Sequence, residues 1–169
     1  WKLDNKSNFL RLGLNSMQQY RIKFILGKIT AYVDALRLGK TTVDDLTSYT
    51  QTAVEIEHIM PQTCADKELY GMNDEDFSVY INRLGNLTLL ENSINKSIHN
   101  DVYANKSKAY KQSKFYLTSS LSELVNQGHD TAINRTNSLL FAWSDWNKRS
   151  IEERQEMLYR LSEMIWEMS

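Results

Sequence analysis

The chain has 169 residues, of which 41% are hydrophobic and 24% are charged, and its formal net charge is −1. This length suits one domain, and this composition is typical of a globular protein rather than a disordered one. The near-neutral charge excludes a polycation that binds nucleic acid through bulk electrostatics. The single cysteine, Cys64, excludes a disulfide framework and a Cys-x-x-Cys zinc site, so we expect no structural zinc.

No repeat or flexible linker divides the chain, so we predict one domain over residues 1–169. No apolar run reaches the roughly 20 residues of a membrane span, and no signal peptide is visible. We therefore expect a bacterial cytoplasmic protein without a membrane partner. Because the chain begins at Trp1 without Met, we expect it to be a fragment of a larger protein.

Residues 1–50 are predicted to form N-terminal helices. Ser16 and Gln19 resemble a capping box at the start of a helix over Met17–Leu38, and Gly39 should end it. A shorter helix is expected to begin in the segment Thr42–Asp45.

Residues 54–115 are predicted to contain a small strand-turn-strand-helix core followed by a basic helix. Val54–Ile59 alternates apolar and charged residues as a half-buried strand does, and Pro61 should end that strand. The polar segment 63–82 should be irregular with one short helix. The remaining expected parts are a turn at Arg83–Asn86, a strand at Leu87–Leu90, a helix that begins at Asn92 or Ser93 and carries Asn95 toward His99, and a helix over Asn105–Val125.

Residues 116–169 are predicted to complete the domain with C-terminal helices. Ser150 and Glu153 read as another capping box, ahead of apolar residues at helical spacing that end at Met168. The predicted fold class is therefore α+β and predominantly helical, with a two-stranded antiparallel hairpin and its helix embedded in flanking helices.

Four polar residues of the central core, Glu57, His58, Asn86 and Asn95, could together hydrolyse a phosphodiester. That reaction needs a base to activate water and a divalent cation to neutralise charge on the phosphoryl and leaving oxygens. A neutral imidazole suits the base, and carboxylate and amide oxygens suit Mg²⁺. Because adjacent residues of a strand point to opposite faces, the strand must end or bulge near His58 for that residue and Glu57 to reach one cation.

The blocks "EHIMPQ" and "LGNLTLL", with Asn95 nine residues after Asn86, resemble the HNH, or ββα-metal, nuclease motif. The closer resemblance is to the C-terminal nuclease domain of GmrSD-type restriction enzymes, and "YANKSKAY" and "IEERQEMLYRLSEMIW" are similar to its downstream helices. It extends from about residue 17 through most of the chain.

This resemblance implies a role for each matching residue. His58 and Asn86 would be catalytic, His58 as the general base and Asn86 as the supporting polar residue of the second strand. Glu57 and Asn95 would bind Mg²⁺, for which Mn²⁺ could substitute. The archetype has His where this chain has Asn95, which permits Mg²⁺ and weakens the case for a softer metal.

Five lysines lie between Lys96 and Lys114, with Asp101 as the one acidic residue among them and aromatic residues interleaved. These lysines could contact DNA phosphates, or they could form a solvated helix face whose aromatic residues turn to the core. The predicted nucleic-acid contacts are Lys96, His99, Lys106, Lys108 and Lys111.

The predicted function is a metal-dependent DNA endonuclease or nickase, the effector of an anti-phage restriction system that acts on modified DNA. An N-terminal nucleotide-hydrolysing domain, in the same or a partner chain, would select the target, because phosphate contacts carry little sequence information. Two alternatives stay open: a non-catalytic nucleic-acid-binding module on a degenerate HNH scaffold, and a helical protein-interaction domain.

Overall fold

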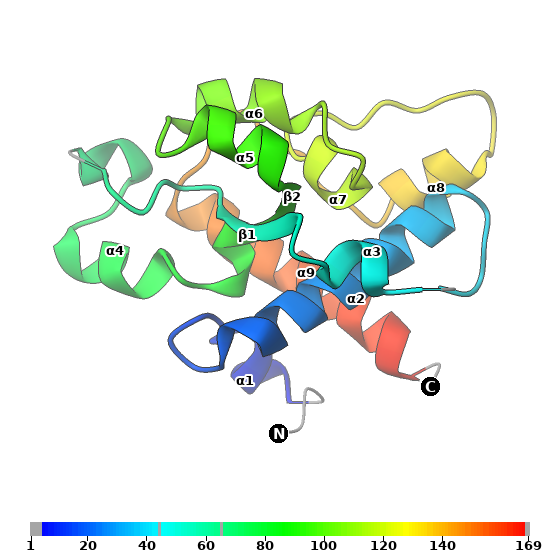
Figure 1. The fold of residues 1–169 in the computed structure, drawn as a ribbon, viewed down its shortest axis with the longest axis horizontal. Coiled ribbons are helices and arrows are strands. Elements are labelled where there is room, and N and C mark those ends of the chain that lie inside the picture. The colour runs from blue at the N-terminus through cyan, green and yellow to red at the C-terminus, as the bar shows by residue number, and fades with distance from the viewer. Residues whose placement is uncertain (1–4, 44, 65, 168–169) are drawn as a thin grey trace.

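A two-stranded antiparallel hairpin lies at the centre of the chain, with helices around it (Figure 1). The computed structural model describes residues 5–43, 45–64 and 66–167. Strand β1 (Val54–His58) pairs residue for residue with β2 (Leu87–Glu91), and Pro61 follows the end of β1 as predicted. The α+β class with a hairpin embedded in helices is thereby confirmed.

The helices lie on both sides of this hairpin. Figure 1 shows α5 and α6 on one side and the long helices α2 and α9 on the other. The helical elements are α1 (Lys6–Phe9), α2 (Gln19–Arg37), α3 (Thr47–Thr50), η1 (Lys67–Tyr70), α4 (Asp74–Tyr80), η2 (Leu84–Asn86), α5 (Asn92–Ile98), α6 (Tyr103–Tyr110), α7 (Tyr116–Ser119), α8 (Ala132–Asn137) and α9 (Lys148–Glu167).

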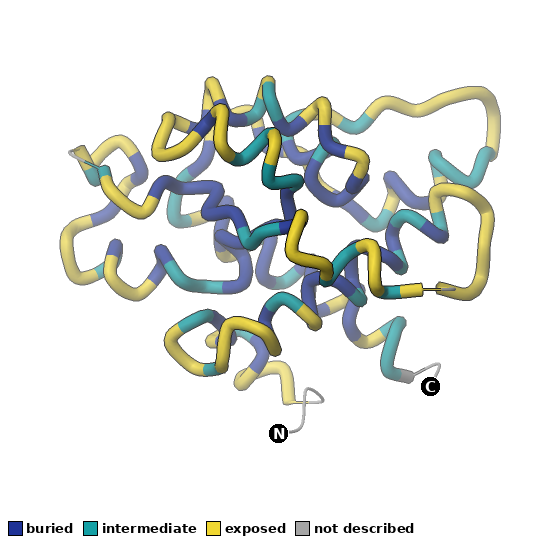
Figure 2. Tube along the Cα trace, viewed as in Figure 1, coloured by how far each residue is buried: buried dark blue, intermediate teal, exposed yellow. Residues whose placement is uncertain are grey.

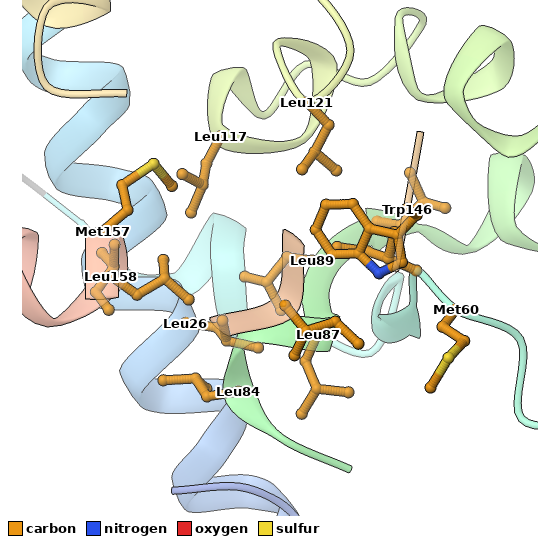
Figure 3. Packing of buried hydrophobic residues seen from close by; sticks show 14 of the residues in the cluster. Leu26, Met60, Leu84, Leu87, Leu89, Leu117, Leu121, Trp146, Met157 and Leu158 are labelled. Carbon is orange, nitrogen blue, oxygen red and sulfur yellow. The ribbon is translucent and has the colours of Figure 1, made fainter. Parts of the chain in front are cut away.

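The hydrophobic core packs against both faces of β2, whose first four residues are all buried. Leu87 and Leu89 lie close to Leu26 of α2 and Leu158 of α9 (Figure 3). Thr88 points the other way and shares a hydrogen bond of 2.6 Å with Thr118 of α7. The hairpin residues are buried or intermediate in exposure (Figure 2), so the hairpin can hold side chains at its end with little backbone freedom.

Both predicted capping boxes are wrong, although both long helices exist. Helix α2 begins at Gln19 without a side-chain cap, because Ser16 uses its hydroxyl within the preceding turn, donating to Gly13 O and accepting from Gly13 N. At α9 the cap is Asn147, whose Oδ1 accepts from the Ser150 amide. The end of α2 is confirmed, since Gly39 has the left-handed φ of 71° that favours glycine.

The predicted helix over residues 105–125 is wrong as one element, because it is divided into α6 and α7. The carboxylate of Glu91 lies at the break and accepts from the Ser113 hydroxyl at 2.7 Å and from the Lys114 amide at 2.8 Å. This partner is distant in sequence and outcompetes continuation of the helix.

Two smaller expectations also change. The short helix predicted from Thr42 begins instead at Thr47, where Asp45 Oδ1 accepts from the Thr47 amide at 2.8 Å, and Asp44 lies outside the described residues. Met168 lies outside them as well. Within residues 5–43, 45–64 and 66–167, no helix has the length and apolar character needed to cross a bilayer.

Candidate active site

The predicted site residues lie around the end of β1, but Glu57 and His58 face opposite sides of the strand. Pairing stays regular through Glu57↔Thr88 and His58↔Leu87, and the Ile59 amide still donates to Asn86 O at 2.9 Å. The strand ends at His58, as expected, without a bulge. The expected bend that would turn both side chains toward one cation is absent from this described segment.

Glu57 points toward α6 and belongs to a buried ion pair. Lys106 Nζ lies 2.6 Å from Glu57 Oε1 and also donates to His58 O at 2.7 Å. Tyr110, one turn further along α6, donates its hydroxyl to the same Oε1 at 2.8 Å. Burial, and then the negative charge of Glu57, raise the pKa of Tyr110 well above its ordinary value, so this tyrosine stays a donor.

Lys106 therefore does not lie at the surface, where its predicted role as a phosphate contact would place it. Its side chain is 1% exposed, and its ammonium is occupied by Glu57 and the His58 carbonyl. In this arrangement Lys106 joins α6 to the end of β1 and has no path to solvent.

Replacing Lys106 with methionine should lower the free energy of unfolding by about 3 kcal/mol, because Glu57 would keep its burial and lose its counter-charge. Urea denaturation would measure the change. The double variant Lys106→Met/Glu57→Leu should recover most of that loss, since a buried pair replaced by apolar side chains is often neutral. If Lys106→Met were as stable as the wild type, the ion pair of Lys106 and Glu57 would not be what holds α6 in place.

Asn95 of α5 lies on the same side of the strand as Glu57. Its Nδ2 donates to Glu55 Oε2 at 2.6 Å, and Glu55 shares a face with Glu57 because side chains alternate along a strand. This contact turns the other amide atom, Oδ1, away from Glu55. Among the described residues, Asn95 Oδ1 and Glu57 Oε2 have no hydrogen-bond partner.

Carboxylate and amide oxygens such as these are of the ligand type that a hard divalent cation prefers. Mg²⁺ prefers oxygen ligands and often takes only one or two from a protein, the rest coming from water and phosphate. Over the described ranges, no group of three or more His, Cys, Asp or Glu residues could hold a metal.

His58 lies on the other side of the strand, against the loop before η2. Its Nε2 is 3.2 Å from Asn82 Oδ1, and its side chain is largely buried. Burial lowers the pKa of His58, the nearby positive charge of Lys106 lowers it further, and the Asn82 hydrogen bond opposes both. The imidazole is therefore neutral at pH 7 and has a lone pair that can accept a proton.

Asn86 is fully buried and holds the backbone together. Its Oδ1 accepts from the Met60 amide at 2.8 Å and from Trp146 Nε1 at 2.9 Å. Its Nδ2 donates to Ile81 O at 2.9 Å and to Met60 O at 3.3 Å. The amide thus joins the segment after β1 to the turn before β2 and has no exposed surface for a substrate.

The basic segment presents part of the predicted nucleic-acid surface. Lys96, Lys108 and Lys111 are exposed, and Lys111 pairs with Glu123 at 2.8 Å. The interleaved aromatic residues Tyr103, Tyr110, Phe115 and Tyr116 are buried in the core. Bases therefore cannot stack on these buried rings. The exposed lysines of this segment can contact phosphates.

His99 lies just beyond the helix that carries Asn95. Helix α5 ends at Ile98, and His99 has a left-handed φ of 35° that turns the chain away from the helix axis. It is exposed and remains a proposed phosphate contact.

Three residues at this site were not predicted from the sequence: Glu55, Asn82 and Tyr110. The sequence spacing could have indicated two of them. Glu55 is two residues before Glu57 and so lies on the same strand face, and Tyr110 is four residues after Lys106 and so lies on the same helix face. Asn82 had none, because it comes from the loop between α4 and η2.

Comparison with known proteins agrees with the resemblance. Neither a search of curated proteins nor a search of solved structures found a match. The family model for GmrSD restriction endonucleases, C-terminal domain, matches residues 3–161, which begins earlier than the predicted residue 17. With this match over nearly its whole length, the chain belongs to the family of C-terminal domains of GmrSD restriction endonucleases.

Proposed function

We propose that this chain is a metal-dependent DNA endonuclease or nickase of the HNH class. The observation that carries the proposal is the position of His58, a largely buried imidazole at the end of β1, in a chain that belongs to a restriction-endonuclease family. Phosphodiester hydrolysis requires a base that is unprotonated near neutral pH, and a histidine with a lowered pKa meets this requirement.

In the proposed reaction His58 takes a proton from water, whose oxygen attacks the phosphorus in line. The bond from phosphorus to the 3′ oxygen breaks, and that oxygen takes a proton from solvent, which leaves 5′-phosphate and 3′-hydroxyl ends. When bound, Mg²⁺ or Mn²⁺ neutralises charge on the phosphoryl and leaving oxygens. Glu57 Oε2 and Asn95 Oδ1 would hold it, and Asn86 would keep the backbone of the site in place. Because Glu57 and His58 face opposite sides of β1, the end of this strand must turn from its regular pairing for both to act on one phosphate.

The proposed substrate is DNA, held through its phosphates with little sequence preference. Lys96, Lys108, Lys111 and His99 are exposed and would supply these contacts, as would Lys114. A nucleotide-hydrolysing domain N-terminal to this one, in the same or a partner chain, would select modified phage DNA in the cytoplasm.

A plasmid-relaxation assay with defined metals tests this function. Supercoiled plasmid should be converted to the nicked form with Mg²⁺ or Mn²⁺ and should stay supercoiled with EDTA, because the leaving oxygen then loses its charge neutralisation. Asn95→Ala should raise the Mg²⁺ concentration for half-maximal rate, whereas Asn100→Ala, an exposed asparagine after α5, should not. Cleavage that persists in EDTA would contradict the proposal.

One observation favours a second candidate, a non-catalytic nucleic-acid-binding module. Glu57 Oε1 is taken up by both Lys106 and Tyr110, which is the arrangement of a structural carboxylate. This candidate predicts plasmid binding without conversion under every metal condition of the same assay.

A further inference from the structure

A chain of hydrogen bonds leads from the imidazole of His58 to the N-terminal loop. Asn82 Oδ1 lies 3.2 Å from His58 Nε2, and Asn82 Nδ2 donates to Asn15 Oδ1 at 2.9 Å. Each atom of the Asn82 amide thus has its own partner, so the amide presents an acceptor to the imidazole and a donor to Asn15.

The backbone on either side of Asn82 is held by the same N-terminal loop. Asn82 O accepts from the Leu14 amide at 2.9 Å, and the Leu84 amide donates to Leu12 O at 2.8 Å. Gly13 lies directly on this segment, where a Cβ would come within 2.1 Å of Asn82 O. The absence of a side chain at Gly13 allows the close approach, which leaves Asn82 little freedom to move away from His58.

The acceptor at Nε2 decides where the ring carries its proton. A neutral imidazole has one N–H and one lone pair, and a carbonyl oxygen such as Asn82 Oδ1 can only accept. The proton therefore lies on Nε2 and the lone pair on Nδ1. Within the described part of the chain, His58 Nδ1 has no hydrogen-bond partner. It is also not one of the fully buried side-chain atoms that lack a hydrogen-bond partner.

We propose that Asn82 is a positioning residue that holds His58 as the Nε2–H tautomer, so that Nδ1 is the nitrogen that takes the proton from water. The loop around Gly13 would act through Asn82 as the support of the base. This inference rests on the proposed nuclease function and assigns an orienting partner and a reactive atom to its base.

Two substitutions of Asn82 separate positioning from a purely structural role. Asn82→Leu removes the acceptor and should lower kcat for plasmid nicking about 10–100-fold with little change in KM. Asn82→Asp keeps an acceptor at the same place, and at pH 8, well above the ordinary histidine pKa of about 6.5, its kcat should stay within a few-fold of wild type. Both variants lose the Nδ2 donor that Asn82 offers to Asn15 Oδ1, so a role limited to that donor predicts that the activity of both falls together. Asn15→Ala leaves the Asn82 acceptor in place and removes only its orienting bond, so it should lower kcat less than Asn82→Leu. Asn100→Ala, which changes an exposed asparagine after α5, is the matched control and should remain active.

Nuclear magnetic resonance of protein labelled with ¹⁵N-histidine reads the tautomer without any cleavage. The chain has three histidines, and His99 and His129 are exposed, so they serve as internal references. Wild type and Asn82→Asp should show a protonated Nε2 on His58 and a ring N–H protected from exchange. In Asn82→Leu that proton should exchange as fast as those of the references.

A protonated Nδ1 in the wild type, or an Asn82→Asp variant as slow as Asn82→Leu, would overturn the inference. If wild type does not cleave at all, the nuclease proposal fails, whereas the resonance measurement still decides the tautomer. The melting temperature of each variant identifies any variant that does not fold. The tautomer of His58 can be read from the wild-type spectrum alone.

Discussion

Replacing His58 with alanine should lower the rate of Mg²⁺-dependent plasmid nicking by about 10²–10⁴-fold, the usual contribution of a general base. The reason is the lone pair that a lowered pKa keeps available at neutral pH. Without it, water must give its proton to solvent as it attacks the phosphorus. Initial rates of conversion from supercoiled to nicked plasmid, at saturating Mg²⁺, would measure the loss.

The matched control is His129→Ala, which removes an exposed histidine far along the sequence and should leave the rate unchanged. Imidazole added to His58→Ala should restore part of the activity, because the truncated side chain leaves space where a free base can bind. Equal rates for wild type and His58→Ala would assign any cleavage to another site.

The hairpin and its following helix could be predicted because their signals are local. Period-two alternation in Val54–His58, Pro61 just beyond it and the apolar run of β2 together define the two strands. Asn95 could be placed on a helix for the same reason, since α5 follows β2 without a loop. Each of these features depends on neighbours within a few residues.

The features that could not be predicted depend on partners far away in sequence. Lys106 reads as one more lysine of a basic face, yet Glu57, 49 residues earlier, draws its ammonium into the core. Glu91 divides the expected helix over residues 105–125 by binding the amide of Lys114, 23 residues later. A charged side chain in the sequence does not show whether tertiary structure will provide a buried counter-charge.

The same limit explains the asparagines of the site. Asn82 and Asn86 stand four residues apart in one turn, and neither has a pattern that distinguishes its role. In the structure Asn82 is half-buried and faces the imidazole, whereas Asn86 is enclosed and faces backbone groups. Only the packing of the Gly13 loop and of Trp146 around this turn separates the two.

Replacing Asn86 with alanine should lower the free energy of unfolding by at least about 4 kcal/mol. Four buried polar groups would lose their partner: the amide and carbonyl of Met60, the carbonyl of Ile81 and the indole N–H of Trp146. Each unsatisfied group costs about 1–3 kcal/mol, and a domain of this size has only about 5–15 kcal/mol in total. Urea denaturation followed by tryptophan fluorescence would measure the change.

Asn105→Ala is the matched control, because Asn105 is exposed on α6 and its Nδ2 bonds to the exposed Asp101. It should change stability by no more than about 0.5 kcal/mol. The pair of results also decides what Asn86 does. A folded Asn86→Ala protein that keeps its stability and loses cleavage would place Asn86 at the substrate. A loss of stability, with cleavage retained by the fraction that remains folded, would make Asn86 the support of the backbone that carries His58.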